Sequence, residues 1–127
     1  MNANELRVGN WVEANSPMMQ VKEITEHTVG LYMPGSEADP FLYDIEEIRP
    51  IKLSPEILEK CGFENQRYEE WEAFAYKDTA ICESWDGVEW VFKYGYDSDL
   101  SIASCEFLHQ LQNLIYALTG EELTYKQ

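Results

Sequence analysis

One periodic pattern near the end of the chain constrains its fold more than any other feature. Between residues 104 and 119, apolar side chains recur at helical spacing and fall within about 120° of arc. These side chains are Phe107, Leu108, Leu111, Leu114, Ile115 and Leu118. The pattern predicts a helix over 104–119, with Ser104 at its N-cap and Gly120 at its C-cap. An apolar stripe of this kind must be covered, and we expect a β-sheet formed by residues 71–94 to cover it.

The segment before this helix predicts that antiparallel sheet. Residues 71–76 are typical of one strand, and Asp86-Gly87 between two β-prone runs is typical of a two-residue type I′ hairpin turn. Such a turn places Glu83 opposite Trp90, among apolar side chains, where loss of water would raise the pKa of its carboxyl. The alternative is that Glu83 lies near the sheet edge or accepts hydrogen bonds from Tyr or Trp donors. The other opposed pairs predicted on that face are Trp85–Val88, Ile81–Phe92 and Thr79–Tyr94.

The first half of the chain predicts four or five short strands separated by turns. Their number and shortness favour a small SH3-like antiparallel β-barrel. Ser54, Pro55 and Glu56 then begin a short helix, and Gly62 ends it as a left-handed cap.

The predicted fold class is therefore α+β. We expect an SH3-like barrel over residues 1–53, followed by a helix, an antiparallel sheet and a C-terminal helix over residues 54–127. The whole chain, residues 1–127, is expected to form a single domain. The sequence leaves open whether its two parts share one core.

The chain is strongly acidic along its whole length. It has 24 Asp and Glu against nine Lys and Arg, which gives a formal net charge of −15. Nine acids and four bases lie before residue 54, and 15 acids and five bases follow, so the two parts carry −5 and −10. Nucleic acids and anionic membranes attract Lys and Arg, so direct binding to either is disfavoured. A basic partner protein is favoured, and the alternative is that the charge only keeps the protein soluble.

The cysteines indicate neither a metal site nor a redox site. Cys61, Cys82 and Cys105 are odd in number and widely spaced, and they form no Cys-x-x-Cys pair. We see no secretory signal and no apolar run near the ~20 residues that span a bilayer, so we expect reduced thiols in a cytoplasmic protein. No cofactor is expected.

The candidate binding residues lie on the predicted C-terminal helix, opposite its apolar stripe. His109, Gln112, Asn113 and Tyr116 form a polar face that could bind a ligand or a partner, and Glu83 is added for its predicted surroundings. The alternative is a solvated face, or a cap for a neighbouring loop. No Ser, Cys or second His is placed beside His109, so no catalytic residue is assigned. Residues 97–99 (Asp-Ser-Asp) lack the glycine and glutamate of a calcium loop, and no metal is expected.

Three segments together resemble a known group of proteins. They are Glu5-Leu6-Arg7-Val8-Gly9-Asn10-Trp11-Val12, then Pro50-Ile51-Lys52-Leu53-Ser54 with Cys61-Gly62-Phe63, and the run from Leu108 to Leu123. The chain resembles a group of small proteins of gut Bacteroidetes and their phages or prophages. The resemblance implies a phage or mobile-element accessory role and carries over no catalytic residue.

The function expected from these features is a protein-interaction or accessory module of phage or mobile-element origin. It would engage a basic host protein through its acidic surface, and one version is that ordered carboxylates mimic DNA. The alternative is a small-molecule-binding protein or an enzyme, with a site near the C-terminal helix that uses His109, Gln112, Asn113 and Glu83. The sequence leaves the partner, the ligand and the oligomeric state open.

Overall fold

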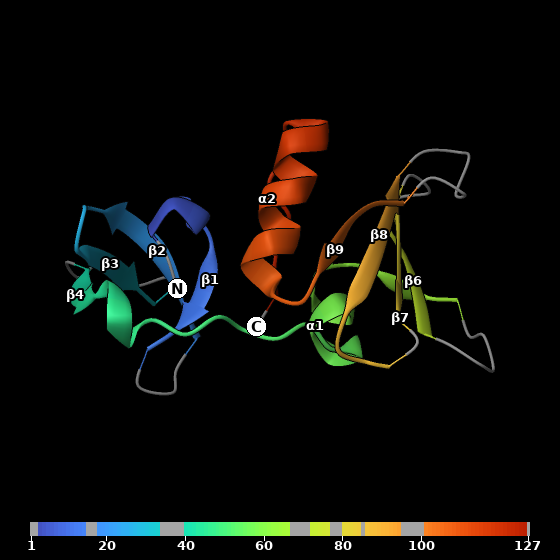
Figure 1. Cartoon of the computed structure of the whole chain (residues 1–127), viewed down its shortest axis with the longest axis horizontal. Helices are drawn as coiled ribbons and strands as arrows, with labels where there is room; N and C mark the ends of the chain where they lie inside the picture. The colour runs from blue at the N-terminus through green and yellow to red at the C-terminus, as the bar shows by residue number, and fades with distance from the viewer. Residues whose placement is uncertain are drawn as a thin grey trace. The chain divides into compact units, whose positions relative to one another are not determined.

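In the computed structural model of the protein, the chain forms two compact units (Figure 1). Unit 1 comprises Met1–Ile51 and Phe107–Gly120, and unit 2 comprises Lys52–Glu106 and Glu121–Gln127. The C-terminal helix, which the sequence grouped with residues 54–127, therefore belongs with the N-terminal strands. The structure describes residues 3–14, 18–33, 40–66, 72–76, 80–84, 86–94 and 101–126.

Unit 1 contains a four-stranded antiparallel sheet and the longer helix. The sheet has the order β1-β2-β3-β4, so each strand pairs with the next one along the chain. Side chains along each strand point alternately to the two faces of the sheet, and one face forms the core, where Val21, Val29 and Leu31 are fully buried. The elements are η1 (Ala3–Glu5), β1 (Trp11–Glu13), β2 (Met18–Ile24), β3 (Thr28–Tyr32), β4 (Phe41–Asp44), η2 (Ile45–Glu47) and α2 (Leu108–Thr119).

The chain after η2 returns to the first strand. The backbone N–H of Glu13 donates to the carbonyl of Arg49 at 3.0 Å, and that of Arg49 donates back to Glu13 at 2.9 Å. The pairing is a single bridge, and the described strands form no closed barrel. The N-terminal part is thus an antiparallel β unit as predicted, whereas the SH3-like barrel is unconfirmed.

Helix α2 begins at Leu108, four residues later than predicted. Residues 101–105 form strand β9 instead, so Ser104 lies in a strand and the expected N-cap at Ser104 is wrong. The side-chain oxygen of Gln110 accepts the N–H of Phe107 at 3.2 Å, which satisfies a backbone group at the start of the helix. The predicted end is confirmed, because Gly120 has φ 75° and its N–H donates to the carbonyl of Tyr116.

Helix α2 contacts strand β1 within unit 1. Leu108, Leu111 and Ile115 from the predicted stripe are buried, while Leu118 at its far end is exposed. The expected packing of this helix on the second sheet stays a prediction. Neither helix of the described residues has the length and apolar character that crossing a bilayer requires.

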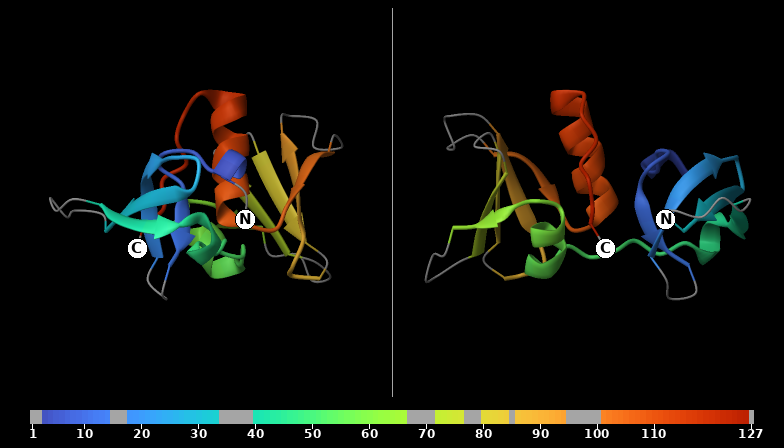
Figure 2. Two further views of the ribbon diagram at one scale, coloured as in Figure 1. Left: turned by 60° about the vertical axis from the view of Figure 1, so that its left-hand side comes forward. Right: turned by 180° about the vertical axis from the view of Figure 1, so that it is seen from behind.

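Unit 2 contains the short helix and a five-stranded antiparallel sheet of order β5-β6-β7-β8-β9, seen from two further sides in Figure 2. The short helix begins as predicted, because Ser54 Oγ accepts the N–H of Ile57 at 3.2 Å. Gly62, at φ 91°, follows its end. The elements are α1 (Pro55–Lys60), β5 (Glu64–Asn65), β6 (Glu72–Tyr76), β7 (Ala80–Ser84), β8 (Trp90–Tyr94) and β9 (Ser101–Cys105).

The β7–β8 hairpin is confirmed, but its predicted register is wrong by one residue. Cys82 lies opposite Phe92, and Glu83 lies opposite Val91 rather than Trp90. The connection is longer than two residues because Asp86 Oδ1 accepts the N–H groups of Val88 and Glu89 at 2.9 and 3.1 Å. A shift of one residue moves every side chain of a strand to the other face, so Glu83 does not share a face with Trp90.

Candidate functional site

The polar face of α2 is occupied by the chain's own N-terminal segment. Gln112 is 1% exposed, and its Oε1 accepts the backbone N–H of Trp11 at 2.9 Å. The Nε2 of the same amide donates to the carbonyl of Gly9 at 3.1 Å. Both ends of a buried amide are thus satisfied by one short stretch of backbone, which fixes that stretch on the helix.

Asn113 extends this network by one residue. Its Oδ1 accepts Nδ2 of Asn10 at 2.8 Å and Nε of Arg7 at 3.2 Å. Its Nδ2 donates to the carbonyl of Glu5 at 2.9 Å. Asn113 therefore meets three residues of the N-terminal segment, with its oxygen accepting two hydrogen bonds and its nitrogen donating one.

Tyr116, one helical turn after Gln112 and Asn113, contacts the Arg7 side chain with the face of its ring. The guanidinium carbon lies 4.3 Å from the centre of the phenol ring, at the spacing of a cation–π contact. Gln112 and Asn113 thus cap a neighbouring segment, which is the alternative given for this polar face in the sequence analysis. Their role in binding a ligand or a partner stays a prediction. The two end segments of the sequence resemblance, residues 5–12 and 108–123, meet through these contacts.

His109 is buried, which corrects the expectation that it lies on the solvated face. It is 2% exposed, its ring stacks on that of Phe107 at a centroid distance of 6.0 Å, and neither ring nitrogen has a hydrogen-bond partner among the described residues. Burial lowers the pKa of His109, against a smaller opposing effect from the Glu5 carboxylate. The imidazole is therefore neutral near pH 7.

A small hollow of about 200 Å³ lies beside this imidazole within unit 1. Its lining consists of Glu5, Pro50, Phe107, His109 and Gln110. Both nitrogens of His109 are shielded from solvent, so the ring lines the hollow without offering it a free polar atom.

Glu83 lies in unit 2, on the half-buried face of strand β7. Its carboxylate is 3.1 Å from Nζ of Lys93 on the neighbouring strand, and both side chains are about one-fifth exposed. The expected apolar surroundings of Glu83 are therefore replaced by an ion pair, as the one-residue change of register requires.

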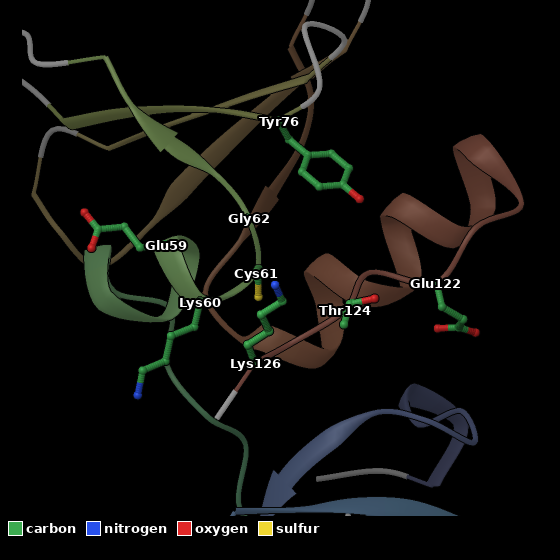
Figure 3. Close-up of a pocket in the computed structure, with 8 residues that line it drawn as sticks. All are labelled: Glu59, Lys60, Cys61, Gly62, Tyr76, Glu122, Thr124 and Lys126. Carbon is green, nitrogen blue, oxygen red and sulfur yellow. The ribbon is translucent and has the colours of Figure 1, made fainter.

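A larger hollow of about 360 Å³ lies within unit 2, between the end of α1, strand β6 and the C-terminal segment (Figure 3). The labelled side chains differ in direction: the Tyr76 hydroxyl and the Lys126 amine point inward, while the side chains of Glu59 and Lys60 extend to the outside of α1. Lys60 forms an ion pair with Glu56, with 3.3 Å between Nζ and Oε1. The complete lining is Glu59, Lys60, Cys61, Gly62, Tyr76, Glu122, Thr124 and Lys126.

The three cysteines are free and buried, in agreement with the expectation of reduced thiols. Burial raises the pKa of Cys61 to about 12 and that of Cys105 to about 11, and it also raises the pKa of Cys82. The thiolate is the reactive form, so these side chains are inert in the folded protein. In the described part of the chain, no three His, Cys, Asp or Glu side chains gather as a metal site.

The described carboxylates all reach the surface. Each acidic residue whose burial the structure describes is exposed, except Glu13 and Glu83, which are half-buried. The acidic segment 97–99 lies outside the described residues. Unit 1 has nine acids and three bases and unit 2 has 15 acids and six bases, so both units carry a negative surface.

Sequence reasoning missed Arg7 and Asn10 as partners of α2. The pair Gly9-Asn10 forms a turn, in which Gly9 has φ 98° and Asn10 Oδ1 accepts the N–H of Arg7 at 2.7 Å. A sequence signal for this role did exist, because the polar Asn10 directly precedes the apolar pair Trp11 and Val12.

Comparison of the chain with protein-family models, curated proteins and solved structures found no match.

Proposed function

We propose that the protein is a non-catalytic interaction module of phage or mobile-element origin, which binds a basic host protein in the cytoplasm. The observation that carries this proposal is the surface position of the carboxylates in a chain of net charge −15. With 24 acids and nine bases, at least 15 carboxylates have no cation of their own, by simple subtraction. A field of this kind steers a positively charged partner and repels phosphate backbones.

The chemistry of the described residues supports a role in binding rather than catalysis. Cys61 and Cys105 are protonated at neutral pH, because burial raises the pKa of each thiol to about 12 and about 11. The two nitrogens of His109 are shielded from solvent. Cys61, Cys105 and His109 therefore present no nucleophile or base to a substrate.

The test is capture of partners from a bacterial lysate on the immobilised protein, with elution by a salt gradient. We expect a specific basic protein that elutes as the salt rises above about 0.15 M, where exposed charges more than roughly 8 Å apart are screened. A matched variant carries Asp44→Asn, Glu46→Gln and Glu47→Gln, which removes three exposed charges without changing side-chain size. Retention of no basic protein, or retention that salt does not change, contradicts the proposal.

One version of this proposal is mimicry of nucleic acid by ordered carboxylates. It predicts that the captured partner is a nucleic-acid-binding protein, and that double-stranded DNA competes with the module for it. A partner that binds DNA and the module at the same time would exclude this version.

We further propose that unit 1 has an SH3-like barrel topology. The short turn η2 between β4 and Arg49, and the return of Arg49 to Glu13 of β1, support this proposal. An experimental structure in which residues 48–50 do not continue alongside β1 would contradict it.

A small-molecule-binding protein is the second candidate, favoured by the hollow of about 200 Å³ at the start of α2. A thermal-shift screen of metabolites tests it. A compound that stabilises the native protein but not His109→Ala, and still stabilises Tyr76→Phe in the other hollow, would support it. The absence of any stabilising compound would leave the interaction module as the better account.

A further inference from the structure

Strand β4 forms one edge of the sheet in unit 1. Among the described strands it pairs only with β3, so its other side is unpaired. The N–H of Ile45, directly after β4, donates to the carbonyl of His27, directly before β3, at 3.0 Å. The pair Ile45–His27 is therefore a hydrogen-bonded pair of the antiparallel ladder. Because hydrogen-bonded and non-hydrogen-bonded pairs alternate, Phe41 and Tyr43 bond to β3, and the backbone groups of Leu42 and Asp44 point outward.

This edge also carries exposed apolar side chains. Phe41 is 59% exposed and Leu42 is 66% exposed, the highest values among the large apolar side chains that the structure describes. Leu42 lies opposite Gly30, which has no side chain to cover it. Edge strands are commonly protected by lysine or proline, and β4 has neither within its bounds.

The surroundings of the edge are negative. Asp44 ends the strand, Glu46 and Glu47 lie in the turn η2 that follows it, and all three are exposed. Unit 1 has three basic side chains. Arg7 lies on the Tyr116 ring, and Nζ of Lys22 lies 5.6 Å from the Tyr32 ring centre. The third, Arg49, is exposed beside Glu13. A second copy of the chain would bring the same carboxylates to the same edge, and like charges across paired strands are destabilising.

We propose that the outer edge of β4 binds an extended segment of the basic partner, which adds a fifth strand to the sheet. The backbone groups of Leu42 and Asp44 supply the hydrogen bonds, and the side chains of Phe41 and Leu42 supply apolar contact. The segment alternates apolar residues with Lys or Arg, so that its charges meet Asp44, Glu46 and Glu47. This inference rests on the proposed function and specifies the surface that carries it.

The first test uses a synthetic nine-residue peptide of alternating Val and Lys as the probe, with backbone amide exchange followed by NMR. At saturating peptide, we expect exchange of the Leu42 and Asp44 amides to slow at least tenfold, while those of Phe41 and Tyr43 change little. The same peptide with N-methyl groups on one edge, and a Val–Glu peptide, are the controls. Strand addition is overturned if the Val–Lys peptide does not bind, or if the N-methylated peptide binds equally well.

The second test uses the full-length protein with Leu42→Pro, which removes one outward N–H that bonds to no neighbouring strand. We expect peptide affinity to fall at least tenfold, with Leu42→Ser as the gentler variant should the proline form not fold. Val88→Ser, an exposed apolar residue of unit 2, is the matched control and should keep the affinity. Unchanged affinity in both Leu42 variants overturns strand addition. Capture of a salt-sensitive basic protein by those variants would meanwhile preserve the proposed function.

Discussion

The side-chain oxygen of Gln112 on α2 accepts a 2.9 Å hydrogen bond from the backbone N–H of Trp11 on β1, across 101 positions of sequence. The same amide donates to Gly9, and its neighbour Asn113 bonds to Glu5, Arg7 and Asn10. Two adjacent side chains thus hold the beginning of the chain on its last helix. The consequence is that the fold of unit 1 depends on residues that the sequence presents as a free polar face.

Replacement of Gln112 by methionine tests this dependence. Gln112→Met keeps the length of the side chain but leaves the N–H of Trp11 and the carbonyl of Gly9 without this partner. We expect the free energy of unfolding to fall by about 1–3 kcal/mol, the cost of one unsatisfied buried group, because the Gly9 carbonyl still accepts a hydrogen bond from Gln20 Nε2 at 3.1 Å. Urea denaturation measures it. Gln66→Met, at an exposed position, is the control and should cost less than about 0.5 kcal/mol.

The buried imidazole of His109 predicts a dependence of stability on pH. Burial lowers the pKa of His109, so the unfolded chain takes up the proton at a higher pH than the folded chain. Above the pKa of about 6.5 in the unfolded chain, titration of His109 therefore leaves the free energy of unfolding unchanged. Below it, the free energy of unfolding falls as the pH drops toward the pKa of His109 in the folded chain. Urea midpoints at pH 7.5 and 5.5 should differ less in His109→Leu than in the native protein. An unchanged slope in His109→Leu would contradict the assignment.

Gly62 allows the chain to turn after α1. Its φ of 91° is disfavoured for other residues, whereas a Cβ there would meet only Tyr76 Cε2, at an ordinary contact distance of 3.9 Å. Gly62→Ala should therefore lower the free energy of unfolding by about 1–2 kcal/mol through the backbone alone. Gly62→Asn should cost less, because asparagine adopts this conformation more readily. Thermal unfolding distinguishes the two, and equal losses would point to a steric cause.

The thiols should resist alkylation until the protein unfolds. Burial raises the pKa of Cys61 to about 12 and that of Cys105 to about 11, and both are shielded from solvent. With iodoacetamide at pH 8, we expect labelling of the folded protein to be at least about 100-fold slower than in urea. Mass spectrometry of the peptides reports each cysteine separately. Rapid labelling of one cysteine in the native state would show that its surroundings open.

Several elements could be predicted from local sequence because their causes are local. Ser54, Pro55 and Gly62 bound the short helix through capping and backbone conformation, which involve only near neighbours. Gly120 ends α2 for the same reason. Trp90 and Phe92, which the predicted hairpin places together on one apolar face, are both fully buried.

The hairpin register depended on more than its turn residues. Asp86-Gly87 predicts a two-residue turn, but the Asp86 side chain binds two following backbone N–H groups, and Ser84 Oγ accepts the N–H of Gly87 at 2.8 Å. These bonds lengthen the connection and leave Cys82 opposite Phe92. The pairing of β8 with β9 likewise takes residues 101–105 into the sheet and delays the start of α2.

By itself, the sequence determined the α+β class, the limits of α1, the end of α2 at Gly120, the apolar stripe of α2 and the acidic character of the chain, because each follows from composition or from residues within a turn of one another. Only the tertiary structure decided that His109 is buried, that Glu83 pairs with Lys93, and that Gln112 and Asn113 hold the N-terminal segment. These outcomes depend on strand register and on contacts across about a hundred residues. Periodicity shows which face of an element is apolar, but it does not show which distant segment will satisfy the polar one.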